Sequence, residues 1–512
     1  MISKKTTKKI GLIVGPLLFL VFIFTPLPQT SELSLEAKIV LAATLWMALW
    51  WVTEAIPIYV TALLPLVLFP SLNVTLLGDT SGSYADRVVF LFLGGFLLAK
   101  AVEKSNLHTR FALHILSVSG TNPKYIVAAF ILVTGILSGW MSNTATAMLM
   151  LPIAAAVISQ IHDKKHQKQF AVCILLSIAY SASIGGMATL IGTPPNAIFA
   201  SLSKSTLDLD VSFSQWLAIG LPISGISLFV LWIYITRIGV RITHIKSIVQ
   251  ESNLIKENLQ KLGRLSRDEK LVAVIFALTA IAWITRGLFW KDLLPMIDDS
   301  TIVVVAAITL FLLPSINESK KENIRHNEKE VVANEEKTLD NLEASNKETQ
   351  DDDGKLLNWK TAIEIPWGVL LLIGGGLALA NAFTTTGLDD WIASQLIFLS
   401  GMPLIVIILV MVAVAIFSSE VISNTAAAAL LIPISASLAT SLDINPILIM
   451  VPLTIATSYG FIMPVGTPPN AIVFATGHVT AAKMAKVGLP LDIIGIILVT
   501  VLTSILVPLL WA

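Results

Sequence analysis

Long apolar runs, separated by shorter polar stretches, extend along almost the whole sequence. A helix needs roughly 20 residues to cross the hydrocarbon layer of a membrane, and about eleven of these runs approach that length once their flanks are included. The runs lie at about 10–28, 37–52, 55–70, 88–102, 170–200, 215–236, 271–289, 301–314, 366–383, 446–475 and 488–511. The pattern predicts an all-α polytopic membrane protein with about 11 transmembrane segments.

Two further apolar regions, residues 125–160 and 403–440, are each interrupted near the middle by a Ser-Asn-Thr sequence. The interruption leaves arms of about 15 residues, which are too short to cross the whole hydrocarbon layer. Non-helical backbone at membrane depth must be buried in protein or face a water-filled cavity, because lipid offers it no hydrogen bonds. We therefore predict two re-entrant hairpins, each of which enters and leaves the membrane on the same side.

The positions of Lys and Arg support this threading. The first run follows a lysine-rich start and precedes no small-residue cleavage site, so we interpret it as a span of the cell membrane with a cytoplasmic N-terminus. The segments 103–124 and 237–270 then fall on the cytoplasmic side and are rich in Lys and Arg. The loops that would lie outside are poor in both residues; they are 71–86, 201–214, 290–300 and 384–402. This asymmetry agrees with the positive-inside rule.

Composition narrows the class of protein further. The chain is 55% hydrophobic and 13% charged, whereas a water-soluble globular protein carries roughly 25% charged residues. Most of its surface should therefore face the lipid bilayer. The formal net charge is zero, so no overall charge attracts nucleic acid, and no nucleic-acid partner is expected. Cys173 is the single cysteine, which excludes an internal disulfide and a cysteine-ligated metal cluster.

Residues 315–358 divide the chain into two halves that repeat the same motifs. This segment is highly charged and poor in large apolar residues, which predicts a disordered cytoplasmic loop. Ser-Asn-Thr at 142–144 recurs at 423–425, and Gly-Thr-Pro-Pro-Asn-Ala-Ile at 192–198 recurs unchanged at 466–472. The threading gives the two copies opposite orientations. Inverted repeats with interrupted membrane segments are typical of secondary transporters, whose site lies near the bilayer midplane.

The Gly-Thr-Pro-Pro-Asn motifs predict breaks in membrane helices. Proline lacks a backbone N–H and clashes with the preceding turn, and the residue before it is pushed out of the helical region. One such proline would indicate a simple kink, but two identical double-proline motifs favour a functional break. A single Ser-Asn-Thr could likewise be a polar turn, or a place where Ser and Thr bond back to their own helix. The pairing of both motifs favours a binding site.

Oxygen atoms at broken helix ends suit a monovalent cation such as sodium, and helix N-termini suit an anion such as a carboxylate. The motifs offer hydroxyl, amide and carbonyl groups but contain no Lys or Arg. Bound cations would therefore supply the positive charge that an anionic substrate needs. This gives a physical reason to couple the anion to sodium.

The two Ser-Asn-Thr tips, the two Gly-Thr-Pro-Pro breaks and the run from Ser419 to Thr425 resemble the divalent anion:sodium symporters over nearly the whole chain. These transporters carry dicarboxylates, citrate or sulfate, and the sequence looks closest to bacterial sodium-coupled dicarboxylate transporters. The resemblance implies a homodimer in which a transport domain moves elevator-fashion against a scaffold. Scaffold helices would occupy 1–124, 237–314 and 359–402, and two transport repeats would occupy 125–236 and 403–512.

Carried over by motif position, the resemblance implies two sodium sites and one shared substrate site. The first sodium site would involve Ser138, Ser142, Asn143 and Gly192, and the second Ser419, Ile422 through its carbonyl, Asn424 and Gly466. Substrate carboxylates would meet Ser142, Asn143, Thr144, Ser423, Asn424 and Thr425, with Thr193, Pro194, Thr467 and Pro468 nearby. In the family pattern, two intact Ser-Asn-Thr tips favour C4-dicarboxylates such as succinate, malate and fumarate over sulfate.

Several alternatives stay open. A sodium-independent dicarboxylate exchanger and a sulfate or tricarboxylate symporter would fit the same motifs. An intramembrane enzyme would need a nucleophile with a base, or a set of metal ligands, at membrane depth. No His lies in a motif, so neither catalytic residues nor an organic cofactor are expected. Glu420 beside the second tip either contacts an ion or orients the loop. Lys100 either reaches the inner membrane interface or replaces a bound cation.

Overall fold

The computed structural model describes residues 4–25, 33–161, 163–242, 253–315, 354–395 and 401–511. Within these ranges the chain forms helices and a single isolated bridge between Pro314 and Lys355, with no strand. The all-α fold that the apolar runs predict is thereby confirmed. Most of the predicted disordered loop at 315–358, namely residues 316–353, lies outside the described residues.

The first seven helices precede the first hairpin. They are α1 (Lys4–Phe24), α2 (Leu35–Thr53), α3 (Ile58–Thr61), α4 (Leu64–Ser71), α5 (Leu77–Tyr84), α6 (Arg87–Lys104) and α7 (Leu107–Ser117). The run at 55–70, predicted as one span, is divided between α3 and α4. Pro57 stands directly before α3 and Pro65 lies in the first turn of α4. Proline is favoured in the first turn of a helix and destabilises a helix interior, so the run divides before Pro65 into two short helices.

Two groups of helices carry the repeated motifs, and a third group lies between them in the chain. The first group comprises α8 (Pro123–Ser138), α9 (Asn143–Ile158), α10 (Lys164–Gly186), α11 (Pro194–Leu207), α12 (Phe213–Tyr234) and its π-helical continuation η1 (Ile235–Gly239). The middle group comprises α13 (Asn253–Lys261), α14 (Arg267–Thr285), η3 (Arg286–Trp290), α15 (Asp299–Leu312), α18 (Trp359–Ala362), α19 (Trp367–Thr386) and α20 (Leu388–Gln395). The second motif group comprises α21 (Leu404–Val421), α22 (Asn424–Ser441), α23 (Ile447–Ala456), α24 (Pro468–Ala475) and α25 (Ala481–Trp511).

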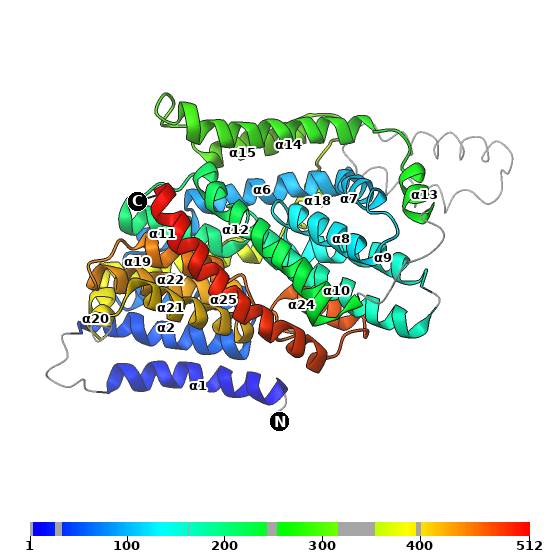
Figure 1. The fold of residues 1–512 in the computed structure, drawn as a ribbon. Coiled ribbons are helices and arrows are strands. Elements are labelled where there is room, and N and C mark those ends of the chain that lie inside the picture. Colours follow the sequence, from blue (N-terminus) through cyan, green and yellow to red (C-terminus); the bar gives the residue numbers. More distant parts are fainter. Residues whose placement is uncertain are drawn as a thin grey trace, which may run out of the picture.

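The two predicted hairpins are α8–α9 and α21–α22, and they lie toward opposite ends of the molecule (Figure 1). The arms of the first are 16 residues each and those of the second 18 each, slightly longer than expected. By length alone the second pair could cross the membrane twice. Whether the two antiparallel arms cross the membrane or only enter it, they return the chain to the side from which it came. The predicted orientation of the later helices is therefore the same for both alternatives.

The two halves interlock around the predicted site. α24 of the second half packs against α9 and α10 of the first, and α11 of the first half packs against α22 and α23 of the second. Figure 1 shows the same exchange, with α24 beside the first hairpin and α11 beside the second. α10 lies at the centre of this arrangement, and every residue from 170 to 186 is buried. Each hairpin is therefore held by a broken helix of the opposite half.

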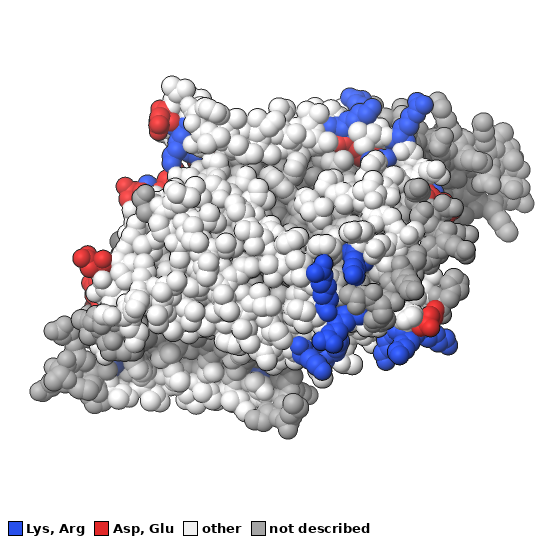
Figure 2. All heavy atoms as spheres, viewed as in Figure 1, with Lys and Arg blue, Asp and Glu red and all other residues white. Residues whose placement is uncertain are grey.

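Nine helices within the described ranges are long and apolar enough to cross a membrane. They are Thr6–Phe24, Leu35–Thr53, Lys164–Gly186, Phe213–Gly239, Arg267–Trp290, Trp367–Thr386, Leu404–Val421, Asn424–Ser441 and Ala481–Trp511. On the face drawn in Figure 2, Lys and Arg gather mostly toward one end, Asp and Glu are prominent at the other, and a broad uncharged surface separates them. This is a multi-pass membrane protein; the count of about 11 spans stays a prediction.

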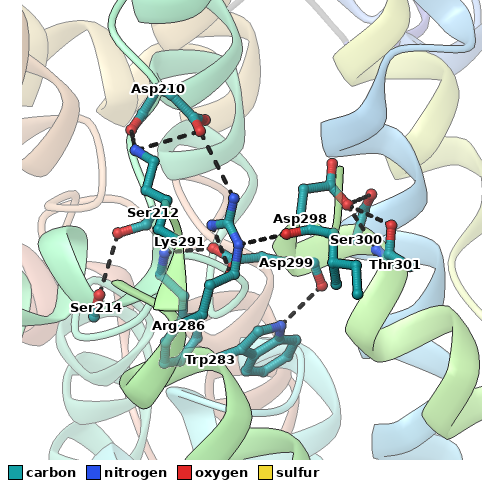
Figure 3. Close-up of polar contacts among 12 residues, drawn as sticks. Asp210, Ser212, Ser214, Trp283, Arg286, Lys291, Asp298, Asp299, Ser300 and Thr301 are labelled. Atoms are coloured by element: carbon teal, nitrogen blue, oxygen red, sulfur yellow. Dashed lines mark hydrogen bonds and ion pairs between the residues drawn. The ribbon is translucent and has the colours of Figure 1, made fainter. Parts of the chain in front are cut away.

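A network of charged side chains joins α6, η3 and the start of α15 to the loop between α11 and α12 (Figure 3). Asp210 of that loop lies 2.5 Å from Arg87, 3.5 Å from Lys291 and 3.9 Å from Arg286. Arg286 also pairs with Asp299 at 3.2 Å, and Asp299 accepts a hydrogen bond from the Phe213 backbone N–H at 2.7 Å. The network thus ties the predicted scaffold to the first predicted transport repeat.

Asp210→Asn is expected to lower the free energy of unfolding by roughly 1–2 kcal/mol, between the values typical of exposed and buried pairs. Burial opposes ionisation of Asp210, but Arg87, Lys291 and Arg286 outweigh it and hold its pKa below the ordinary value. Because the folded-state pKa is depressed, the contribution is complete above about pH 4 and is lost as the pH falls through the folded-state pKa. Thermal unfolding in detergent between pH 3 and 7 measures both effects.

The matched control is Asp208→Asn, two residues away, because Asp208 pairs only with the exposed Lys204 among the ion pairs of the described residues. It should unfold like the wild type at every pH. Equal unfolding temperatures for Asp210→Asn and wild type at pH 7 would contradict a stabilising role of this network.

Candidate functional site

Each Ser-Asn-Thr sequence begins the second arm of its hairpin. Ser142 is the N-cap of α9 and its Oγ accepts the Ala145 N–H at 3.2 Å, while Ser423 caps α22 by accepting the Ala426 N–H at the same distance. The backbone angles agree closely, with φ −62° and ψ 141° at Ser142 and φ −62° and ψ 145° at Ser423. Serine is favoured at this position because it satisfies an N–H that the helix leaves free. Both tips therefore present a helix N-terminus.

The Gly-Thr-Pro-Pro-Asn motifs also begin helices. α10 ends at Gly186 and α23 at Ala456, and the chain is irregular until the prolines start α11 and α24. Thr193 and Thr467 are the N-caps of these two helices. The predicted breaks are present, but they begin five or more residues before the motif. The prolines occupy the first turn of the following helix, where the missing N–H costs nothing.

An asparagine in each motif holds the break in shape. Asn196 Nδ2 donates to Gly186 O at 3.3 Å and to Thr189 O at 2.8 Å. Asn470 Nδ2 donates to the corresponding carbonyls, Gly460 O at 2.9 Å and Met463 O at 3.1 Å. Both side chains are fully buried. The sequence prediction assigned no role to either residue, although their recurrence in the repeated motif was a signal.

The first group of predicted cation ligands comes together between the hairpin tip and the first break. Ser138 Oγ lies 2.6 Å from both Asn143 Oδ1 and Ala182 O. A hydroxyl has one hydrogen, so it cannot donate fully to both acceptors. A Cβ placed on Gly186 would lie 2.6 Å from Asn143 Oδ1 and 3.1 Å from Gly192 O, which puts those oxygens beside the same glycine. Such a concentration of oxygens with few hydrogens suits a cation.

The second group of predicted cation ligands is arranged similarly but lacks a hydrogen bond between its serine hydroxyl and its asparagine oxygen among the described residues. Ser419 Oγ donates to Thr457 O at 2.9 Å, and Asn424 Oδ1 is buried without a hydrogen-bond partner among the described residues. Ile422 is the extended residue directly before the tip, at φ −119° and ψ 163°. Gly466 lies beside Glu420, whose Oε2 would be 3.1 Å from a Cβ placed there. The tip and the break therefore meet here as well.

The predicted substrate residues surround these helix starts with unequal exposure. Ser142, Asn143, Thr144, Ser423 and Asn424 are half-buried, as is Pro194, whereas Thr425, Thr193 and Thr467 are buried. Pro468 is exposed, and so are Met463 and Val465 in the second break. Their counterparts in the first break, Thr189 and Ile191, are buried. The second half of the site is thus the more accessible one.

Glu420 and Lys100, which the sequence left open, both have defined partners. Glu420 accepts the Ile462 N–H at 2.7 Å through Oε1 and the Met463 N–H at 2.8 Å through Oε2. The carboxylate therefore orients the loop of the second break. Lys100 pairs with Glu103 at 3.0 Å and with Glu364 at 3.2 Å, and neither acid belongs to a motif. These pairs favour a structural lysine over a charge that replaces a bound cation.

Comparison with known proteins places the sequence among transporters. Residues 6–512 match the family described as the sodium:sulfate symporter transmembrane region. The chain is 38% identical over 508 residues to a protein of Staphylococcus saprophyticus named sodium-dependent dicarboxylate transporter SdcS, covering 98% of this chain and 91% of that protein. The protein of the same name from Staphylococcus aureus strain RF122 is 37% identical over the same shares.

Two solved structures share the fold at low sequence identity. The Alcanivorax borkumensis YdaH transporter has a TM-score of 0.56 at 12% identity, covering 99% of this chain and 98% of that chain. Neisseria gonorrhoeae MtrF, described within a class of antimetabolite efflux pumps, has a TM-score of 0.54 at 12% identity and covers 99% and 95%. At this identity the likeness concerns the fold alone.

Proposed function

The chain belongs to the family of the sodium:sulfate symporter transmembrane region and is a membrane transporter rather than an enzyme, and from this premise we propose that it couples sodium to the uptake of dicarboxylates. The substrates we propose are C4-dicarboxylates such as succinate, malate and fumarate. The observation that carries the proposal is the 38% identity to a sodium-dependent dicarboxylate transporter over 98% of the chain. The paired helix starts at the two tips and two breaks support it.

In this proposal each half of the chain binds one sodium ion. Ser138, Ser142, Asn143 and Gly192 contribute to the first ion, and Ser419, Ile422, Asn424 and Gly466 to the second. Gly139 O belongs with the first set, because it lies 3.1 Å from a Cβ placed on Gly192. The two ions bring positive charge to a site whose motifs contain no Lys or Arg. Sodium binding therefore prepares the site for an anion, which is the physical basis of coupling.

The substrate carboxylates would meet the N-termini of α9 and α22. There Ser142, Asn143 and Thr144 face one end of the substrate and Ser423, Asn424 and Thr425 the other, with Thr193, Pro194, Thr467 and Pro468 nearby. Helix N-termini carry partial positive charge, which favours carboxylate. Two such tips, one from each copy of the repeated motifs, suit a substrate with a carboxylate at each end.

We further propose that the chain forms a homodimer in the plasma membrane with its N-terminus in the cytoplasm. The transport repeats at 125–236 and 403–512 would move as an elevator against scaffold helices at 1–124, 237–314 and 359–402. The interlocking of α11 with α22, and of α24 with α9, supports movement of the two repeats as one body.

Uptake of radiolabelled succinate into proteoliposomes tests the proposal. With no internal dicarboxylate, an inward sodium gradient should drive accumulation, and replacing sodium with potassium should abolish it. Uptake that requires internal dicarboxylate and ignores sodium would instead establish the exchanger. Inhibition by sulfate or citrate, but not by malate or fumarate, would point to a sulfate or tricarboxylate symporter.

A further inference from the structure

One face of α12 holds the backbone of the first break. Trp216 Nε1 donates to Met187 O at 3.0 Å, and Ser224 Oγ donates to Ile184 O at 2.9 Å. Between these two donors, a Cβ placed on Gly220 would lie 2.6 Å from Met187 O, so the helix and the break are in close contact. Residues four apart lie on the same face of a helix, and the three α12 positions are spaced in this way.

The anchored carbonyls lie on either side of Gly186, the glycine beside the first group of predicted cation ligands. A Cβ placed on Gly186 would lie 2.6 Å from Asn143 Oδ1 and 3.1 Å from Gly192 O. Ile184 precedes Gly186 by two positions and Met187 directly follows it. The two hydrogen bonds from α12 therefore fix the stretch of backbone that brings those oxygens together.

The same helix also holds the second break, through a serine three positions further along. Ser227 Oγ lies 2.8 Å from the Tyr459 hydroxyl, and it donates to Ile223 O of its own helix at 2.7 Å. Because the single hydrogen of Ser227 goes to Ile223 O, the Tyr459 hydroxyl donates to Ser227. Both side chains are buried, so leaving either of them without its partner would be costly.

Tyr459 directly precedes Gly460, whose carbonyl accepts the motif asparagine as the corresponding glycine of the first break does. A Cβ placed on Gly460 would lie 3.5 Å from Ser419 O, and Ser419 belongs to the second group of predicted cation ligands. The residue after this glycine is anchored too, since the Tyr180 hydroxyl of α10 donates to Phe461 O at 3.0 Å. In both breaks, side chains of the first half thus hold the backbone on each side of the glycine.

We propose that α12 positions both sodium sites, the first through Trp216 and Ser224 and the second through Ser227 and its partner Tyr459. These side chains contact neither the ions nor the substrate in the proposed site; they are positioning residues that act through the backbone of the breaks. Loss of an anchor lets the oxygens of one break spread apart, which weakens sodium binding in that half. This role rests on the sodium-coupled function proposed above.

Hydrogen exchange of the purified protein tests the role of α12, because peptides covering 184–193 and 457–467 report on the two breaks separately. Sodium should slow exchange in both breaks, and the sodium concentration that gives half of this protection is measured without succinate. Ser224→Ala leaves Ile184 O without its donor, so it should raise that concentration about fivefold at the first break and less than about twofold at the second.

The pair formed by Ser227 and Tyr459 allows a double-variant test at the second break. Ser227→Ala leaves a buried tyrosine hydroxyl without an acceptor and should raise the half-protection concentration about tenfold, whereas Tyr459→Phe removes that hydroxyl and should raise it about threefold. The double variant should return to about threefold, because no hydroxyl is then left unpaired. A product of the two single effects, roughly thirtyfold, would overturn the link between the two side chains.

Ser177→Ala is the matched control. Ser177 is a fully buried serine on α10 whose hydroxyl bonds within its own helix, to Cys173 O at 2.8 Å. It should leave the half-protection concentration of both breaks as in the wild type. Equal shifts at the two breaks in Ser224→Ala, or no shift in Tyr459→Phe, would overturn the positioning role of α12.

The wild type separates this role from the proposed function. If sodium slows exchange at neither break in the wild type, the sodium-coupled function fails and the role of α12 fails with it. If sodium protects both breaks but all the variants match the wild type, only the role of α12 is wrong. If the expected shifts occur and succinate is not taken up, the proposed substrate fails while the role of α12 stands.

Discussion

Asn143→Ala and Asn424→Ala should each reduce sodium-driven succinate uptake by roughly 100-fold, corresponding to about 3 kcal/mol for a lost interaction with a charged group. Each substitution removes an amide at a hairpin tip. Asn143 Oδ1 lies 2.6 Å from Ser138 Oγ within the first group of oxygens, and Asn424 Oδ1 is buried without a partner in the described part of the chain. Initial uptake rates in proteoliposomes, normalised to the amount of inserted protein, measure the loss.

Asn381→Ala is the matched control. Asn381 lies on α19 of the predicted scaffold, and its amide donates to Ser83 Oγ of α5 at 3.0 Å. It should keep most of the uptake activity. Near-normal uptake in both Asn143→Ala and Asn424→Ala would remove the hairpin tips from the proposed site.

The features that the sequence predicted well depend on local rules. A serine before an apolar run is a common helix N-cap, and Ser142 and Ser423 both take that position. Proline is favoured in the first turn of a helix and disfavoured in its interior, so a new helix that starts at the prolines of each Gly-Thr-Pro-Pro-Asn motif followed from residue type. The apolar length pattern was sufficient to predict an all-α membrane protein.

Other features depend on contacts between segments far apart in the chain, and the pattern of residue types does not reveal such contacts. The hydrogen bonds of Asn196 to Gly186 and Thr189 determine where the first break begins, and the motif alone places it too late. Glu420 is paired with the N–H groups of Ile462 and Met463, more than forty positions away.

Gly192→Ala should abolish sodium binding at the first site and reduce uptake by roughly 100-fold, since the two cations and the substrate are proposed to bind together. A methyl group on Gly192 would overlap the Gly186 carbonyl oxygen and lie 3.1 Å from the Gly139 carbonyl oxygen. Both contacts are backbone, which cannot move without opening the break. Sodium-dependent thermal stabilisation and uptake together measure the effect.

Gly466→Ala is the corresponding change in the second half, and it should be milder. The nearest atom to the new methyl is Glu420 Oε2 at 3.1 Å, the end of a side chain, followed by the Met463 carbonyl oxygen at 3.4 Å. A side chain can shift by a few tenths of an ångström where a backbone carbonyl cannot, so we expect roughly a tenfold loss.

Gly225→Ala is the control for both, because no atom lies within 4 Å of a Cβ placed on that α12 residue. Since this exposed position has room for the methyl, and alanine favours helix over glycine, Gly225→Ala should transport like the wild type. The expected order of loss is therefore Gly192, then Gly466, then Gly225. An equal loss at Gly192 and Gly225 would mean that packing space around the first break does not limit cation binding.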